Sequence, residues 1–129
     1  QRIFEPMGMK NTQWRDDYRK IVKNRAIAYT KNGDTYLQNM PFEMVHGNGG
    51  LLTTTADLIT RNQNYKTRQI GGKTFAAIQL LAAKTNIGVS VDYAAGLRIS
   101  EYNGFKEISH SGATAGYRAW LAYYPEPDI

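Results

Sequence analysis

The segment from Phe105 to Tyr117 combines residue types that can do chemistry more closely than any other part of the chain. It reads as a strand that runs into small residues, with the imidazole of His110 next to the hydroxyl of Ser111. Small residues let a ligand approach backbone N–H groups, and the edge of a sheet presents such groups in a row. The pattern predicts a wall that binds the carbonyl or oxyanion of a substrate. A single histidine at the end of a strand is, by itself, more often a structural residue.

The strands that hold this segment are predicted from alternation and turn residues. From Tyr93 onward the pattern favours a strand over residues 93–101, a turn at Asn103-Gly104 and a returning strand over residues 105–109. A third strand is predicted over residues 118–124. Consecutive strands with such short connections form an antiparallel meander.

The elements before this meander are predicted to be helices and one hairpin. Thr54 to Asp57 fits a capping pattern that opens a helix, and a second helix is predicted over residues 74–83, with its apolar face toward the core. Residues 25–38 read as a hairpin with a turn at Asn32-Gly33. Helices followed by a meander predict the α+β class, with an antiparallel sheet flanked by helices.

Composition excludes several kinds of site. The chain has 129 residues, one domain's worth, and no cysteine, and its two histidines, His46 and His110, are far apart without a carboxylate cluster. We therefore expect no metal and no cofactor. The net charge of +5 and the basic cluster over residues 15–25 raise the possibility of nucleic-acid binding. No nucleic-acid motif accompanies the cluster, so a solvated basic face is the preferred interpretation and no nucleic-acid partner is expected. No apolar stretch is long enough for a membrane span.

Four segments resemble, in the same order, motifs of the serine β-lactamase-like hydrolases. This family includes class C β-lactamases, D-alanyl-D-alanine carboxypeptidases, penicillin-binding proteins and related esterases. The resemblance to its C-terminal part is carried by His-Ser-Gly at 110–112, Thr-Ala-Gly-Tyr at 114–117 and Trp-Leu-Ala-Tyr-Tyr-Pro-Glu at 120–126. Residues 3–12, 25–29 and 49–58 resemble the family's Pro-Leu-Gly-Met-x-x-Thr, Ala-x-Gly-Tyr and Gly-Gly-Leu-x-Ser-Thr-x-x-Asp-Leu motifs, with Ala28 in place of a glycine.

The resemblance implies a role for each residue of the wall. In this family a strand with Lys-Thr-Gly or His-Ser/Thr-Gly lines the active site. His110 then takes the catalytic cationic or hydrogen-bonding position, and Ser111 binds a substrate carboxylate or carbonyl. Gly112 leaves room for the acyl group, and the backbone N–H of Ala113 is one of two oxyanion donors. The resemblance also implies a partial β-lactamase/transpeptidase-like fold, a small peptide-like or ester substrate, and the periplasm or the outside of the cell envelope as location.

The family's nucleophile motif, Ser-x-x-Lys, and its Tyr/Ser-x-Asn motif are not found in the chain. We therefore expect residues 1–129 to be a fragment of one catalytic domain, truncated at both ends and inactive by itself. Two functions stay open: part of a serine hydrolase that forms an acyl-enzyme on peptide-like amides, β-lactams or esters, or a catalytically inactive penicillin-binding-protein-like module that binds cell-wall peptide or a protein partner. Because a cut sheet exposes strand edges, self-association is also expected.

Overall fold

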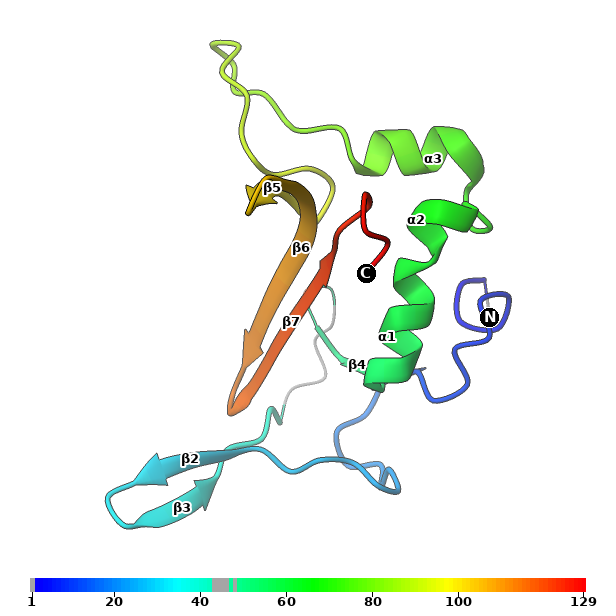
Figure 1. The fold of residues 1–129 in the computed structure, drawn as a ribbon. Helices are drawn as coiled ribbons and strands as arrows, with labels where there is room; N and C mark the ends of the chain where they lie inside the picture. The colour runs from blue at the N-terminus through cyan, green and yellow to red at the C-terminus, as the bar shows by residue number, and fades with distance from the viewer. Residues whose placement is uncertain (1, 43–46, 48) are drawn as a thin grey trace.

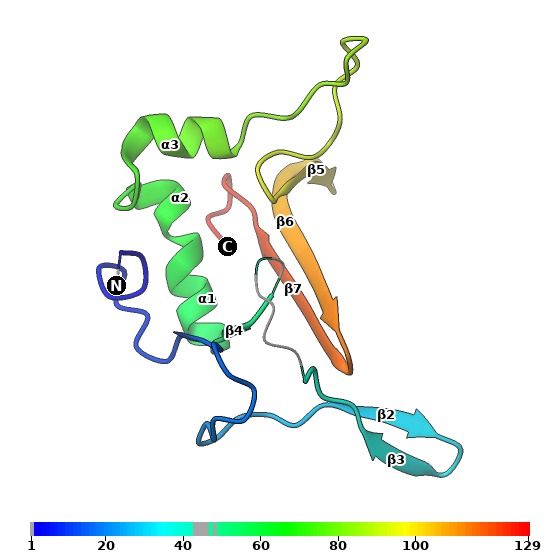
Figure 2. The same ribbon diagram turned by 180° about the vertical axis from the view of Figure 1, so that it is seen from behind.

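The computed structural model describes residues 2–42, 47 and 49–129, so His46 and part of the loop before the second half of the chain lie outside the described residues. The elements in chain order are β1 (Gln13–Trp14), β2 (Tyr29–Asn32), β3 (Thr35–Gln38), β4 (Leu51–Leu52), α1 (Thr55–Asn62), α2 (Asn64–Thr67), α3 (Gly72–Gln79), β5 (Arg98–Tyr102), β6 (Phe105–Thr114) and β7 (Tyr117–Tyr123). The three helices lie along one side of the antiparallel sheet β5–β6–β7 (Figures 1 and 2). The predicted α+β class, with a sheet flanked by helices, is confirmed.

The sheet is built from two consecutive hairpins. Asn103 and Gly104 form the first turn. Their φ angles are 50° and 82°, and a type I′ turn requires positive values at both positions. β6 does not stop at Ser109 as the sequence predicts, because β7 pairs with it from Ile108 to Thr114. The small residues after Ser109 are therefore part of the strand.

The β2–β3 hairpin projects away from the sheet and the helices (Figure 1). Its predicted turn is wrong by one residue: Asn32 pairs with Thr35, and the turn consists of Gly33 and Asp34. Gly33 has a φ of 58, whereas Asn32 and Asp34 have no positive φ. A positive φ at the first turn residue alone is typical of a type II′ turn, in which glycine takes that position.

The base of this hairpin is attached to the turn between β6 and β7. The N–H of Gly116 donates to the carbonyl of Asn39 at 3.0 Å, and the hydroxyl of Tyr117 donates to the carbonyl of Ala26 at 2.7 Å. A Cβ on Gly116 would lie 2.9 Å from the carbonyl oxygen of Tyr29, so the two backbones meet where a side chain does not fit. The end of β6 is thereby positioned by a segment distant in sequence.

A buried carboxylate joins the N-terminal segment to the first helix. Thr54 caps α1 as predicted, since its hydroxyl accepts the N–H of Asp57 at 3.3 Å. Asp57 is only 5% exposed, and its Oδ2 accepts the N–H of Asn11 at 2.8 Å and the hydroxyl of Thr12 at 2.7 Å. β1 and β4 pair beside these contacts. Two of the segments that carry the family resemblance are thus in contact through one side chain.

The second predicted helix is shorter and faces another way than expected. α3 ends at Gln79 instead of continuing to residue 83. Its predicted core residues Phe75 and Ile78 are 48% and 61% exposed. The side of this segment that meets the rest of the chain is occupied by Ala76, which is buried, and by Leu80, which packs against the core. The prediction of the buried face was wrong because periodicity identifies an apolar face but not whether another element covers it.

The core between the sheet and the helices is small. Leu97, Ile108 and Tyr123 are buried together, and the ring of Tyr65 stacks on Tyr123 with centroids 5.5 Å apart. The chain exposes 9599 Å², whereas a compact monomer of 14.5 kDa exposes roughly 6,900 Å². The chain therefore exposes more surface than a compact domain, and large apolar side chains such as Ile21, Leu81 and Ile87 are among those exposed. Among the described residues, no helix has the length and apolar character needed to cross a membrane.

Candidate functional site

The candidate site lies on β6, the middle strand of the sheet. β5 pairs with β6 only as far as Ser109, whose partner is Arg98, the first residue of β5. Beyond that point, residues 110–114 pair with β7 on one side. Their other side carries no strand among the described residues. The second half of β6 is therefore an open edge, beginning at His110.

The backbone groups at this edge follow from the pairing pattern. Hydrogen-bonded and non-bonded pairs alternate along antiparallel strands, and a two-residue turn closes on a bonded pair. The turn after Tyr102 makes Phe105 a hydrogen-bonded residue toward β5, and the turn after Thr114 makes Thr114 a hydrogen-bonded residue toward β7. Counting in steps of two from each turn, the odd-numbered residues of β6 bond to β5 and the even-numbered ones bond to β7. Ser111 and Ala113 therefore direct their backbone N–H and C=O groups outward. The N–H of Ala113 is thus free to bind an acceptor at the edge.

The four candidate residues share a strand but not one face of the sheet. Side chains alternate along a strand, so His110 and Gly112 lie on the face of the buried Ile108, and Ser111 and Ala113 lie on the opposite face. All four are exposed. The sequence treats them as one wall and places His110 at the end of a strand. In the structure His110 lies within the strand, and only Ser111 and Ala113 of the four present backbone groups at the open edge.

Tyr93 is a neighbour of His110 that sequence reasoning missed. Its hydroxyl and the Nε2 of His110 form a hydrogen bond of 2.8 Å, and the two ring centroids are 6.0 Å apart. Tyr93 is held there by a β-bridge to Arg98 and by the N–H of Ala83, which donates to its carbonyl at 2.9 Å. When the hydroxyl donates, Nδ1 of the neutral imidazole carries the proton. No local sequence pattern distinguishes Tyr93 from the other tyrosines of the chain.

A second missed group is the carboxylate of Glu107, three residues before His110. Glu107 is 7% exposed and accepts hydrogen bonds from the hydroxyls of Tyr124 at 2.6 Å, Ser109 at 2.8 Å and Ser100 at 3.3 Å. The Tyr124 hydroxyl and the two serines hold the pKa of this carboxyl below its usual value, against the effect of burial. The network stabilises β6 on the face opposite the helices.

The basic cluster at residues 15–25 is only partly the solvated face that the sequence predicts. Arg15 is 5% exposed, and its guanidinium donates to the carbonyl of Pro41 at 2.8 Å, so its assignment to the surface was wrong. Arg19 donates to Asp17 at 2.7 Å and lowers the pKa of that carboxyl to about 2. Lys20 pairs in the same way with a neighbouring aspartate. Much of the positive charge in this cluster is therefore neutralised locally.

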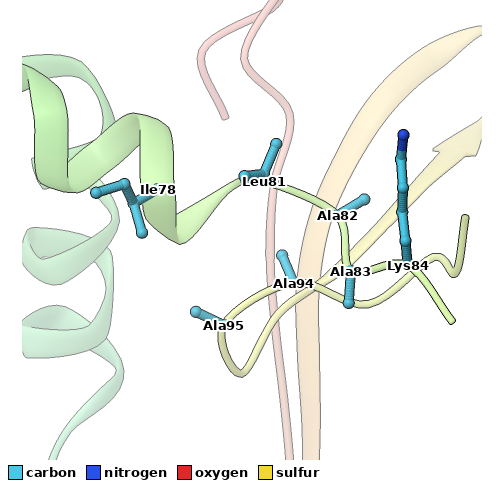
Figure 3. A pocket seen from close by; sticks show the side chains of 7 residues that line it. All are labelled: Ile78, Leu81, Ala82, Ala83, Lys84, Ala94 and Ala95. Carbon is cyan, nitrogen blue, oxygen red and sulfur yellow. The ribbon is translucent and has the colours of Figure 1, made fainter. Parts of the chain in front are cut away.

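Neither of two hollows on the surface is lined by the candidate residues 110–113. One of about 280 Å³ lies beside the basic cluster and has Tyr18 and Phe42 in its lining, and one of about 670 Å³ lies at the end of α3 (Figure 3). No group of three or more metal-ligating side chains occurs in the described part of the chain. The site is an open strand edge with an imidazole beside it. Such an edge can bind an extended backbone and donate a hydrogen bond to an oxyanion.

Comparison with solved structures identifies the fold. The chain matches an octameric penicillin-binding protein homologue from Pyrococcus abyssi with a TM-score of 0.81 and 24% identity, covering 98% of this chain and 30% of that one. It matches a penicillin binding protein from Bacillus halodurans with a TM-score of 0.77 and 18% identity, covering 96% and 39%. No family model and no curated relative matches.

These likenesses show that the chain has part of the α+β fold found in penicillin-binding-protein homologues. The chain spans 30% of the length of the first protein and 39% of the length of the second. At this level of identity the comparison defines the class of fold. Any role for residues 110–113 has to be argued from the geometry of the β6 edge.

Proposed function

We propose that residues 1–129 are part of the catalytic domain of a serine hydrolase that forms an acyl-enzyme on peptide-like amides, β-lactams or esters. One observation carries the proposal: the open edge of β6, where Ser111 and Ala113 present backbone groups beside the exposed His110. The serine nucleophile would belong to polypeptide outside this chain. The chain covers only 30% and 39% of the two neighbours, which supports the idea that a longer polypeptide carries the nucleophile elsewhere.

Each residue of the edge has a role in this proposal. The N–H of Ala113 donates to the carbonyl oxygen as it becomes an oxyanion, an interaction worth about 3 kcal/mol in the transition state. Ser111 binds a carbonyl or carboxylate of the substrate, and Gly112 leaves space for the acyl group. The imidazole of His110, oriented by Tyr93, supplies a hydrogen bond or a positive charge at the entrance to the edge.

Binding of an acyl-D-alanyl-D-alanine peptide to the 129-residue chain, followed by backbone amide NMR shifts, tests the role of the edge. We expect the amides of Ser111 and Ala113 to shift. Ala113→Pro removes the outward N–H without removing a bond to β7, so the fold is retained and binding is lost. Ala113→Ser keeps the N–H and should bind like the unmodified chain. Unchanged binding by Ala113→Pro, or shifts confined to other regions, would exclude this edge as the substrate wall.

The second candidate is a catalytically inactive penicillin-binding-protein-like module that binds cell-wall peptide or a protein partner. It is supported by the sequence of the chain, in which the open edge of β6 is not accompanied by a Ser-x-x-Lys motif. Both candidates predict peptide binding at β6, so binding does not separate them. A fluorescent penicillin applied to the longer polypeptide does: stable covalent labelling of a serine requires the hydrolase. If labelling is absent and simple acyl esters are not hydrolysed, the inactive module is the remaining candidate.

Self-association is the third part of the proposal. The neighbour from Pyrococcus abyssi is octameric, and this chain exposes roughly 2,700 Å² more than a compact monomer of its mass. Among the exposed side chains are large apolar ones such as Ile21, Leu81 and Ile87, and exposed apolar surface promotes association. The chain is accordingly proposed to bind copies of itself.

A further inference from the structure

The smaller hollow, of about 280 Å³, lies at the base of the β2–β3 hairpin (Figure 1), beside the basic cluster. One of its walls comes from residues 18–25, and the other comes from the hairpin base and residues 38–42. Apolar and aromatic side chains make up most of the lining, among them Tyr18, Ile27 and Phe42. Concave surfaces of this composition bind the apolar part of a ligand.

The wall formed by residues 38–42 is held by contacts of its own. The buried guanidinium of Arg15 donates to the carbonyl of Pro41 at 2.8 Å, and Met40 beside it is buried. The rings of Tyr18 and Phe42 meet edge to face, with their centroids 5.8 Å apart, so the two walls are in contact. The shape of the hollow is therefore preformed.

Three cationic side chains line the hollow, and two of them are already paired. Arg19 bonds to Asp17 and Lys20 bonds to Asp16, each at 2.7 Å. In the part of the chain that the structure describes, Arg25 has no ion pair. Its Nε is shielded from solvent and has no hydrogen-bond acceptor. Such donors are rare in folded proteins, because the hydration that they lose is not replaced.

A carboxylate in the hollow would supply the acceptor that Arg25 lacks. A guanidinium presents Nε–H and one Nη–H side by side, and this fork fits both oxygens of a carboxylate. The guanidinium would turn toward the hollow as the ligand enters, and its unsatisfied donor would gain a charge-assisted hydrogen bond. A phosphate carries about two negative charges, so one cation would leave an excess of negative charge beside apolar walls. The charge of the lining therefore favours a carboxylate.

We propose that this hollow binds a small carboxylic acid with an aromatic or branched apolar body, as a free molecule or as the C-terminal residue of a peptide. Its carboxylate pairs with Arg25, and its body packs against Tyr18, Ile27 and Phe42. The volume lies at the lower end of the range for ligand pockets, about 300–1,000 Å³, so the ligand is small. No residue of β6 lines the hollow, so tests of this site succeed or fail separately from the hydrolase proposal.

Titration of the 129-residue chain with phenylacetate, followed by the Nε–Hε NMR signal of Arg25, tests the site directly. We expect this signal to shift until binding saturates. Phenylacetamide has the same body without the charge, and inorganic phosphate has charge without the body. Each should bind at least about tenfold more weakly than phenylacetate. Equal binding of phenylacetate and phenylacetamide, or an Arg25 signal that does not respond to phenylacetate, would overturn the proposal.

Substitution of Arg25 tests whether it is the cation that binds the ligand. Arg25→Gln should raise the dissociation constant of phenylacetate, measured by calorimetry, at least about tenfold. Arg25→Lys keeps the charge but loses the fork, so its constant should lie between those of Arg25→Gln and the unmodified chain. Arg2→Gln, the same change at an exposed arginine outside the hollow, is the matched control and should leave the constant unchanged. Equal effects of the two glutamine substitutions would exclude Arg25.

A short peptide that ends in phenylalanine separates the two sources of the carboxylate. If its free acid binds as tightly as phenylacetate and its C-terminal amide does not, the ligand is the end of a peptide. If phenylacetate binds and both forms of the peptide fail to bind, the ligand is a free acid. Binding of the peptide amide as tightly as the peptide acid would contradict the pairing with Arg25.

Discussion

Substitution of Gly116 by alanine should separate the β2–β3 hairpin from the turn that ends β6. The added Cβ would lie 2.9 Å from the carbonyl oxygen of Tyr29, 3.0 Å from its nitrogen and 3.0 Å from the Cβ of Ala28. Two of these atoms are backbone, and Ala28 is only 6% exposed, so none can rotate away. Overpacking of this kind costs about 1–3 kcal/mol. We expect the free energy of unfolding to fall by that amount.

Gly112→Ala is the matched control, four residues earlier in the same hairpin. There the new Cβ would meet only the Cβ of Ala119, at 3.9 Å, an ordinary contact. Neither glycine has a positive φ, so backbone strain does not enter the comparison. We expect Gly112→Ala to leave stability unchanged or to raise it slightly, because alanine restricts the unfolded chain.

Urea denaturation followed by tryptophan fluorescence measures both variants. With an m-value of about 2 kcal/mol per M, the midpoint for Gly116→Ala should fall by about 1 M. The reasoning is refuted if both variants unfold at the same urea concentration. It is also refuted if Gly112→Ala is the less stable of the two, since the close approach at Gly116 would then carry no energy.

Three further predictions concern single side chains. Asp57→Ala should cost about 1–3 kcal/mol in thermal or urea unfolding, because it removes the buried carboxylate that accepts two hydrogen bonds from residues 11–12; a cost below 0.5 kcal/mol, which is roughly the scatter of a neutral surface change, would contradict this. The folded-state pKa of Glu107 is lowered from 4.5, so its ionised form stabilises the fold above that pH and the contribution is lost as the pH falls through the folded-state pKa. Glu107→Gln should flatten the dependence of unfolding free energy on pH below the ordinary carboxyl pKa of 4.5, and an unchanged acid slope would disprove the assignment. Tyr93→Phe should alter the imidazole ¹⁵N shifts of His110 with little change in stability, because both side chains are exposed; identical shifts would show that the hydroxyl does not orient the ring.

Local chemistry was sufficient for part of the fold. The Asn103-Gly104 turn, the Thr54 cap of α1 and the order of helices before a meander all depend on residues within a few positions of each other. The same locality explains the errors. The turn of β2–β3 lies at Gly33-Asp34, one residue later than predicted, where Gly33 alone has a positive φ. The apolar face of α3 could be recognised from its spacing, but Phe75 and Ile78 on that face are exposed because no other element covers them.

What the sequence by itself determined about this protein is its class of fold and the residues of one candidate wall, because alternation, capping and turn preferences are properties of short segments. Only the tertiary structure decided that β6 continues to Thr114, that β5 ends opposite Ser109 and that the edge beyond is open. It also brought Tyr93 to His110 and Asp57 to Thr12. These pairs are separated by 17 and 45 residues, and contacts at such distances depend on how whole elements pack.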